Sequence, residues 1–339
     1  MSEVTPYKWK IRVKESNDFL YEVQYDDYEW IDPQSVDNTP IMTGGCSAAH
    51  VGDFFGRNLD LGFNEDVSFV MRCSKSGCKK SIGMAVKPGL TRSIVRGEEV
   101  VEEYNDLPFY TMDGINEDGL VISTHVVPKV EGLTKAAKGR TVGTKQVIKS
   151  LWFPRYVLDN CSTVTQVQSA LNNLVLTMET ATTGDYNHHF LVADKNGNTI
   201  CVEFHKPNTS GVGEIYVHDV SAHPWLTNFH ITRADNYAKI GLKSDKTLPT
   251  PFTEIENPSE VPSNYGVEPI CNGLERWNTL ARECINSDGS IKTLYNEESM
   301  INIMRSVYYS NAYKSYSSIE ERWCSEFLGT DGVPSVDVS

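Results

Sequence analysis

The sequence predicts an α+β protein in which antiparallel strands and helices form separate groups along the chain. Strands follow one another from Cys46 onward, two helices come next, and more strands and a final helical group follow. The dipeptide Asn196-Gly197 between two apolar runs is a strong hairpin signal. Strands joined by hairpins are typical of layered α+β domains, whereas parallel sheets alternate each strand with a helix. The order of elements therefore predicts antiparallel sheets packed against helices.

The expected strands are short, apolar and bounded by turn residues. The first two surround Val51-Gly52-Asp53, a connection short enough to predict a hairpin. The predicted strands span Cys46–His50, Phe54–Leu59, Val67–Arg72, Ser81–Val86, Leu120–Val127, Phe190–Ala193 and Thr199–Phe204.

Helical periodicity marks four segments. After residues 162–163, either of which suits an N-cap, apolar residues recur at helical spacing as far as Val175. Another helix is predicted over Val142–Leu158, where Pro154 should kink or interrupt it. Further helices are predicted over Leu274–Ile285 and Glu297–Tyr308, and a closing hairpin over Trp323–Leu328 and Val333–Val338.

The composition narrows the classes of partner. The 339 residues carry a net charge of −14, which repels nucleic acids and anionic membranes. No signal peptide is recognisable, and no apolar run approaches the length of a membrane span, so we expect a cytoplasmic protein. The eight cysteines form no Cys-x-x-Cys pair. Neither a zinc site nor a disulfide framework is therefore predicted, and no metal or cofactor is expected.

Residues 1–45 differ in character from the rest of the chain. Acidic and aromatic side chains crowd residues 25–30, and Pro40 breaks regular structure before the sequence Thr-Gly-Gly-Cys at 43–46. The double glycine fits a tight turn, and it also gives the backbone the freedom that cleavage of the next peptide bond needs. We predict a propeptide-like segment over 1–45 and a main domain over 46–339.

Cys46, Arg57 and Asp60 suit nucleophilic chemistry if the first two strands pair. A guanidinium beside a thiol favours the thiolate. Cleavage before Cys46 would give that residue an α-amine, whose pKa near ~8 suits a base for its own thiol. A carboxylate would then orient the amine. The same residue types also fit a core cysteine beside a surface Arg–Asp pair.

Five blocks of sequence, in order, bear on this choice. Cys46 is followed by Gly-Arg-Asn-Leu-Asp at 56–60, and residues 113–120 read Asp-Gly-Ile-Asn-Glu-Asp-Gly-Leu. The other blocks are residues 189–203 with the His, Asp, Gly and Glu of a hairpin, Leu-Thr-Asn at 226–228 and Glu-Arg-Trp at 275–277. Together they resemble the choloylglycine hydrolase and penicillin V acylase family, which is similar to acid ceramidase and the N-acylethanolamine acid amidase.

The resemblance implies an N-terminal-nucleophile (Ntn) hydrolase with a four-layer αββα fold. Such an enzyme cleaves a linear, non-peptide amide through a thioester. Carried over residue by residue, the resemblance implies that Cys46 is the nucleophile, Asp60 binds the amine and sulfur region and Arg57 supports the thiolate. It implies Asn228 as the oxyanion donor, and Arg276 in the charge network behind the nucleophile.

Three departures from the family pattern refine these expectations. The 45 residues before Cys46 resemble relatives that cut themselves into two chains, so we predict autocleavage at Gly45–Cys46. Val126 stands where bile-salt hydrolases carry an asparagine, so one side-chain contact is missing or replaced. Phe-His at 229–230 follows the Leu-Thr-Asn block instead of a proline, which predicts a different path for that loop.

The leading prediction is therefore hydrolysis of a small-molecule N-acyl amide, bile salt or penicillin V-like amide. Val126 favours N-acyl amides in general over conjugated bile salts. An alternative is an acyltransferase on the same scaffold, in which an amine takes the acyl group from the thioester. A third hypothesis, motivated by the long N-terminal segment, is an uncleaved, non-catalytic binding protein. The resemblance also suggests a homo-oligomer.

Overall fold

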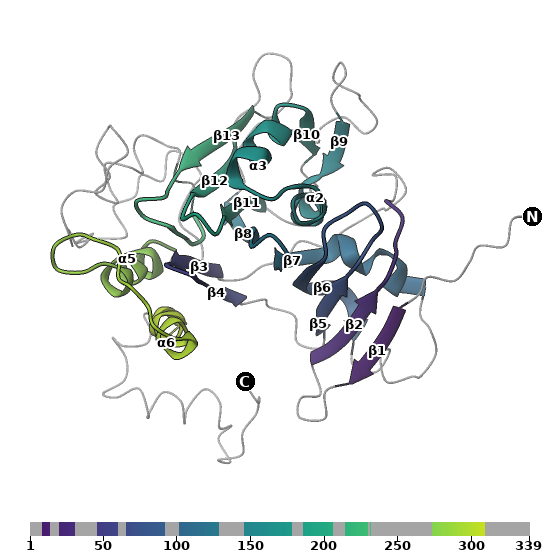
Figure 1. The fold of residues 1–339 in the computed structure, drawn as a ribbon, viewed down its shortest axis with the longest axis horizontal. Helices are drawn as coiled ribbons and strands as arrows, with labels where there is room; N and C mark the ends of the chain where they lie inside the picture. Colours follow the sequence, from purple (N-terminus) through teal and green to yellow (C-terminus); the bar gives the residue numbers. More distant parts are fainter. Residues whose placement is uncertain are drawn as a thin grey trace, which may run out of the picture.

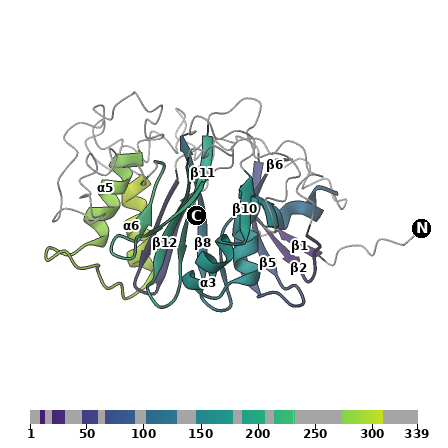
Figure 2. The same ribbon diagram turned by 90° about the horizontal axis from the view of Figure 1, so that it is seen from above.

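The computed structural model describes residues 9–13, 20–30, 46–59, 66–91, 102–128, 146–177, 186–205, 214–229, 231 and 273–308. Within this part of the chain two β-sheets lie face to face, and helices cover the outer face of each sheet (Figure 1, Figure 2). The predicted α+β class and the four-layer αββα arrangement are confirmed.

The larger sheet has nine strands among the described residues. In order across the sheet they are β1 (Trp9–Val13), β2 (Leu20–Tyr25), β5 (Asp66–Cys73), β6 (Ser81–Thr91), β7 (Thr111–Asn116), β8 (Val121–Pro128), β11 (Tyr186–Ala193), β12 (Thr199–His205) and β13 (Glu214–Asp219). Neighbours pair antiparallel except β2 and β5, which run parallel. This agrees with the hairpin-rich sheet expected from the sequence.

The smaller sheet carries the predicted hairpin at the centre of the molecule. Its described strands are, in order, β14 (Trp225–Leu226), β3 (Cys46–Val51) and β4 (Phe54–Leu59). The turn between β3 and β4 places Gly52 at φ +61°, a left-handed conformation that glycine adopts without steric cost. Cys46 pairs with Leu59 at the open end of the hairpin, so β3 begins at the predicted nucleophile.

Two helices cover each outer face. On the smaller sheet lie α5 (Gly273–Cys284) and α6 (Glu297–Tyr308), as predicted. Helix α6 approaches β4 closely, because a Cβ added to Gly56 would lie 2.5 Å from Met300 Sδ and 2.7 Å from Met304 Cγ. On the larger sheet lie α2 (Phe153–Asn160) and α3 (Val164–Leu171), which share an apolar cluster with β11 and β12.

One helix prediction is wrong and one is too long. Within the range 142–158, residues 146–149 form strand β9 (Gln146–Lys149), which pairs parallel with β10 (Leu174–Thr177). Pro154 lies in the first turn of α2, where no amide hydrogen is needed, and so begins a helix rather than breaking one. The helix predicted as far as Val175 is too long, because α3 ends at Leu171 and residues 174–177 form β10. A short apolar run fits the spacing of a helix as well as that of a strand. Two 3₁₀ helices, η1 (Glu102–Tyr110) and η2 (Ser150–Trp152), complete the described elements.

Part of the N-terminal segment is built into the larger sheet. Tyr21, Val23 and Tyr25 alternate inward along β2 and are buried in an apolar cluster with residues of β5. Farther on, the Tyr28 hydroxyl donates a 2.5 Å hydrogen bond to Asp159 of α2. Residues 20–30 therefore belong to the core on the side of the molecule away from α5 and α6 (Figure 1).

Two further expectations concern the ends and the membrane. The closing hairpin predicted over 323–328 and 333–338 lies outside the described residues. Among the helices that are described, none has both the length and the apolar character needed to cross a bilayer.

Candidate active site

Cys46 is the first residue of β3 and lies buried between the sheets, 1% exposed. Strand β14 pairs with β3 so that Leu226 lies opposite Ala48. The chain after β14 therefore returns beside the start of β3 and brings Asn228 to Cys46. The backbone nitrogen of Cys46 donates to Asn228 Oδ1 across 2.5 Å, and both residues are shielded from solvent. Two segments distant in sequence, the start of β3 and the chain after β14, thus meet at one peptide nitrogen.

Arg276 of α5 closes this cluster from the helical side. Its guanidinium donates to the Cys46 carbonyl, to Ser47 Oγ at 2.7 Å and to Asn228 Oδ1. A planar guanidinium with several donors suits such a fork of acceptors. The structure thus places three of the five predicted site residues in direct contact. Ser47, the residue after Cys46, is a contact that the sequence analysis missed.

Asn228 also binds the larger sheet. Its Nδ2 donates a 2.6 Å hydrogen bond to the carbonyl of Val126 on β8. The Val126 side chain lies in the apolar cluster that includes Leu151 and Trp152. At Val126, where the sequence analysis predicts a missing or replaced side-chain contact, a backbone carbonyl therefore accepts from Asn228. One of the two amide hydrogens of Asn228 is used in this way.

Arg57 lies on β4 opposite Ala48, two residue pairs along the hairpin from the Cys46–Leu59 pair. Its guanidinium donates to the carbonyls of Asn58 and Thr124. Arg57 Nε lies 3.8 Å from Asp113 Oδ2 on β7 and makes no hydrogen bond within the described residues. No direct contact joins Arg57 to Cys46 among the described atoms, so its effect on the thiol would be electrostatic.

Asp113 is a second residue that the sequence analysis left without a role. Burial raises the pKa of Asp113 to about 6, although the Arg57 guanidinium and a backbone hydrogen bond from Met84 oppose the shift. Asp113 is the first residue of the Asp-Gly-Ile-Asn block, and its place in that block is the sequence feature that could have identified it as a site residue. Asp60, in contrast, lies just beyond the described part of β4, so its predicted role stays a prediction.

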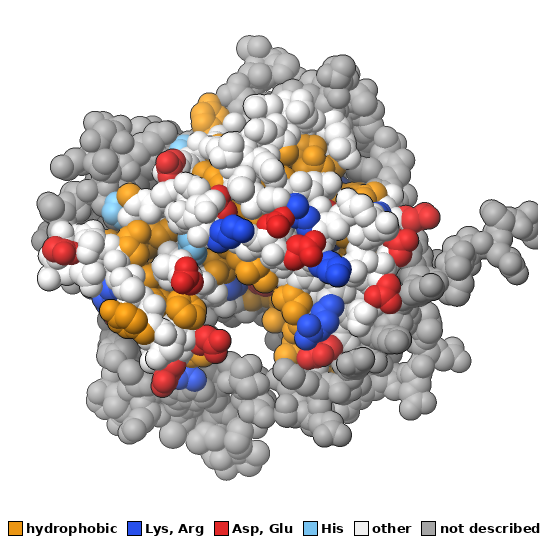
Figure 3. All heavy atoms as spheres, in the orientation of Figure 1, with side chains coloured by type: hydrophobic (Ala, Val, Ile, Leu, Met, Phe, Trp, Pro, Cys, Tyr) orange, Lys and Arg blue, Asp and Glu red, His pale blue; other side chains and the backbone are white. Residues whose placement is uncertain are grey.

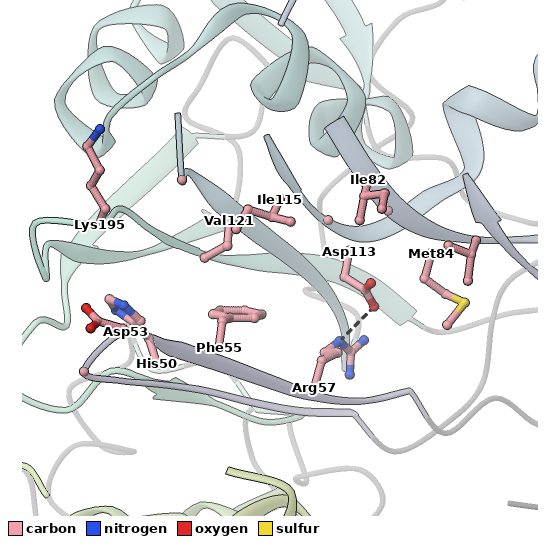
Figure 4. A pocket seen from close by; sticks show the side chains of 15 residues that line it. His50, Asp53, Phe55, Arg57, Ile82, Met84, Asp113, Ile115, Val121 and Lys195 are labelled. Atoms are coloured by element: carbon pink, nitrogen blue, oxygen red, sulfur yellow. Dashed lines mark ion pairs between the residues drawn. The ribbon is translucent and has the colours of Figure 1, made fainter. Parts of the chain in front are cut away.

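A cavity of about 490 Å³ opens beside Arg57, between the two sheets (Figure 4). Arg57 and Phe55 form one wall from β4, and Ile82, Met84 and Ile115 form the opposite wall from β6 and β7. Its size is that of a small-molecule site, and its walls are mainly apolar with a few polar groups.

On the face drawn in Figure 3, the acidic and basic side chains of the described residues are interspersed, so they form no basic patch suited to nucleic acid there.

His125 is a buried histidine of β8 that lies beside His189 of β11. Its Nε2 is 2.9 Å from Ser123 Oγ, and its ring lies edge-on to that of His189 with centroids 5.6 Å apart. Burial lowers the pKa of His125 well below its usual value, and the charges of Arg57, His189 and Arg276 lower it further. His125 is therefore a neutral ring at physiological pH.

One group of side chains has the spacing of a metal site. Ligand atoms of His189, Cys201 and Glu203 lie within 4.8 Å of one another, and all three residues are fully buried. The His189 ring nitrogens already face Glu203 Oε1 at 3.0 Å and the Thr227 carbonyl at 2.7 Å. Burial and the Glu203 carboxylate raise the pKa of Cys201 well above its usual value, which disfavours the thiolate that metals prefer. This geometry suits hydrogen bonding better than metal binding.

One protein family and several solved structures are similar to this chain. The family model "Linear amide C-N hydrolases, choloylglycine hydrolase family" matches residues 46–247, starting at Cys46. Similar solved structures include two variants of the conjugated bile acid hydrolase from Clostridium perfringens, 18% and 17% identical, with 78% of each chain covered and TM-scores of 0.46. Penicillin V acylase from Agrobacterium tumefaciens is 15% identical, with 78% of this chain and 72% of that one covered and a TM-score of 0.41. No curated protein matches the chain.

Proposed function

Because the chain belongs to the choloylglycine hydrolase family of linear amide C–N hydrolases, we propose that it hydrolyses its substrate through Cys46 after cleavage at Gly45–Cys46. The contact that carries the proposal is the 2.5 Å hydrogen bond from the Cys46 nitrogen to Asn228 Oδ1. Cleavage would turn that nitrogen into an α-amine already held in place. The amine would then be ready to act as a base for the thiol of the same residue.

In the proposed reaction Cys46 Sγ bonds to the amide carbon of the substrate while its proton passes to the α-amine. The proton then moves to the leaving nitrogen, the C–N bond breaks and a thioester remains. Water next attacks the thioester, its proton returns through the amine to sulfur, and a carboxylic acid leaves. The thiol proton thus leaves with the amine product, and a proton from water replaces it on sulfur, so the α-amine acts as a general base in one step and a general acid in the next.

The neighbouring side chains have distinct proposed roles. Asn228 Oδ1 orients the amine, and the amide hydrogen that does not bind Val126 is directed to the developing oxyanion. Arg276 holds the Cys46 carbonyl, and Arg57 is proposed to support the negative charge that develops on the sulfur during the reaction. Asp60 is proposed to bind the amine and sulfur region from the end of β4.

We also propose that cleavage divides the chain into a segment of residues 1–45 and a hydrolase domain of residues 46–339. For this step the Cys46 thiol would attack the Gly45 carbonyl carbon, so that the acyl group passes from nitrogen to sulfur. This shift breaks the Gly45–Cys46 C–N bond and frees the α-amine of Cys46. Water would then hydrolyse the thioester, releasing the Cys46 thiol and the carboxylate of Gly45.

The proposed substrate is a small N-acyl amide with an apolar portion. Support comes from the apolar walls of the cavity beside Arg57, which suit such a group. The backbone carbonyl at Val126, in place of an asparagine side chain, favours N-acyl amides in general over conjugated bile salts.

The test combines the intact mass with product analysis. We expect a fragment that begins at Cys46 in the wild type and in a Cys78→Ala control, and a single chain in Cys46→Ala. The processed protein should release acid and amine in equal amounts from N-acyl amides. Transfer of the acyl group to an added amine would instead identify an acyltransferase. An uncut 38.0 kDa chain at neutral and acid pH, with no activity, would contradict the proposal.

A further inference from the structure

His189 and Glu203 lie opposite each other on neighbouring strands behind the candidate nucleophile. Phe190 of β11 pairs with Val202 of β12 in antiparallel register. His189, which precedes Phe190, therefore lies opposite Glu203, which follows Val202. Both side chains are fully buried, and His189 Nδ1 lies 3.0 Å from Glu203 Oε1. They point to the inner side of the sheet, like Leu191 and Cys201, which pack against the smaller sheet.

This pair holds both ends of the loop that carries Asn228. On one side, His189 Nε2 lies 2.7 Å from the carbonyl of Thr227, the residue before Asn228. On the other side, the backbone nitrogen of Ile231 donates to Glu203 Oε1 across 2.8 Å. The loop between these contacts presents Asn228 Oδ1 to the Cys46 nitrogen. Two buried side chains therefore fix the peptide that positions the candidate nucleophile.

The hydrogen-bond pattern determines how many protons the pair carries. A carbonyl only accepts, so His189 Nε2 must carry a hydrogen to bind Thr227. One further proton lies between Nδ1 and Glu203, whichever of the two atoms it is bound to. In either arrangement the pair has no net charge, so the protein buries it without an uncompensated ion. Removal of His189 would take away one hydrogen bond to Glu203 Oε1 and the hydrogen bond to the Thr227 carbonyl, both buried.

We propose that His189 and Glu203 form a positioning pair that sets the orientation of Asn228 and, through it, of the Cys46 nitrogen. The proposal rests on the proposed function for its effect on catalysis. Its structural part, the hold on the loop, is independent of that function. His189 and Glu203 contact Thr227 and Ile231 on either side of Asn228, so they act through the loop that carries Asn228.

The test replaces His189 and compares it with a neighbour. His189→Phe removes both ring nitrogens, whereas His189→Gln retains an N–H donor for the Thr227 carbonyl. The matched control is His188→Phe, because His188 is also buried on the same strand but faces the helical layer, where Nδ1 lies 3.4 Å from Ser150 Oγ. Glu203→Gln, which keeps an acceptor for the Ile231 amide, is the second arm if His189→Phe does not fold.

Two measurements separate the structural and catalytic parts. Hydrogen exchange of peptides covering residues 225–231 and 46–51 should accelerate in His189→Phe, remain near wild type in His189→Gln and be unchanged in His188→Phe. In the processed enzyme, kcat should fall about 100-fold in His189→Phe, since small misplacements of reacting groups cost that much, with KM within threefold. His189→Gln should recover most of the lost kcat.

The outcomes are distinguishable. Equal exchange rates at 225–231 in His189→Phe and His188→Phe would overturn the positioning role. Unchanged kcat in a folded His189→Phe enzyme would overturn it as well. If the wild type has no activity but exchange at 225–231 responds as described, the proposed function fails while the hold of the pair on the loop stands.

Discussion

The Tyr28 hydroxyl donates a hydrogen bond to Asp159 Oδ1 across 2.5 Å and so joins residues on opposite sides of the candidate cleavage point. Arg155 Nε donates to the same carboxylate oxygen at 2.8 Å, and its guanidinium lies 5.6 Å from the Tyr28 ring centroid. All three residues are buried. If the chain is cut at Gly45–Cys46, the N-terminal piece therefore remains tied to α2 by this network and to β5 by strand pairing.

We predict that the two pieces stay together after cleavage. They should co-elute in native size-exclusion chromatography and separate only in denaturant. Tyr28→Phe leaves Asp159 without one buried hydrogen bond and should lower the free energy of unfolding by about 1–3 kcal/mol. Tyr295→Phe, at a position 87% exposed, should leave it unchanged. A cleaved protein that loses its N-terminal piece under native conditions would contradict the prediction.

We predict that even the conservative substitution of Arg276 by lysine lowers activity. A lysine carries the charge but cannot reach the Cys46 carbonyl, Ser47 Oγ and Asn228 Oδ1 together from one planar group. Arg276→Lys should reduce kcat about 100-fold and slow alkylation of the Cys46 thiol. The control is Arg282→Lys on the same helix, where the guanidinium donates to Thr279 Oγ1. Equal alkylation rates in both variants would count against the role of Arg276.

Asp113 gives a prediction for the pH dependence of stability. Because its pKa in the folded protein is about 6 against an ordinary value of 3.8, the folded state binds more protons than the unfolded state between these values. The contribution of this group to stability is therefore present below pH ~4 and is lost as the pH rises through about 6. Asp113→Asn should gain stability relative to wild type over that interval, as measured by urea unfolding at pH 4, 5, 6 and 7. Parallel pH profiles would refute it.

Gly114 is predicted to tolerate no side chain. An added Cβ would lie 2.7 Å from the Ile82 carbonyl oxygen and 3.0 Å from the Gly83 Cα, and these backbone atoms cannot move aside cheaply. Gly114→Ala should cost about 1–3 kcal/mol by overpacking. Gly289→Ala meets nothing within 4 Å, so its cost comes only from φ +86°, about 1 kcal/mol. Thermal unfolding of the two variants compares the effects, and equal losses would show that β6 and β7 can separate.

Local sequence patterns were enough to predict much of the fold. The strands around the Val-Gly-Asp turn and the helix over 297–308 have clear periodicity, and the structure places them within a residue of the prediction. The short segment Leu-Val-Leu-Thr at 174–177 fits a helix and a strand equally well, and only its pairing with residues 146–149 decides between them. Strand β2 has the alternating burial of a strand, but it was not predicted because acidic residues surround it. Its parallel partner, β5, follows some 40 residues later, so no local pattern indicates the pairing.

The candidate site divides in the same way. Cys46, Asn228 and Arg276 were named from motif positions, and the structure brings them into contact. The pair of His189 with Glu203 was not predicted as a site, because a histidine at the start of a strand is ordinarily structural and its partner depends on the register of two strands. Asp113 was missed because burial, which shifts its pKa, cannot be deduced from a single block of sequence.

The position of β2 in the larger sheet bears on how reversibly the protein unfolds. Before a cut at Gly45–Cys46, β2 and β5 belong to one chain, and their pairing is a unimolecular event. After the cut, an unfolded molecule must recapture its N-terminal piece from solution, so refolding becomes second order and depends on protein concentration. The precursor would then refold from denaturant at any dilution, whereas the processed form would recover only when its two pieces are concentrated enough to meet.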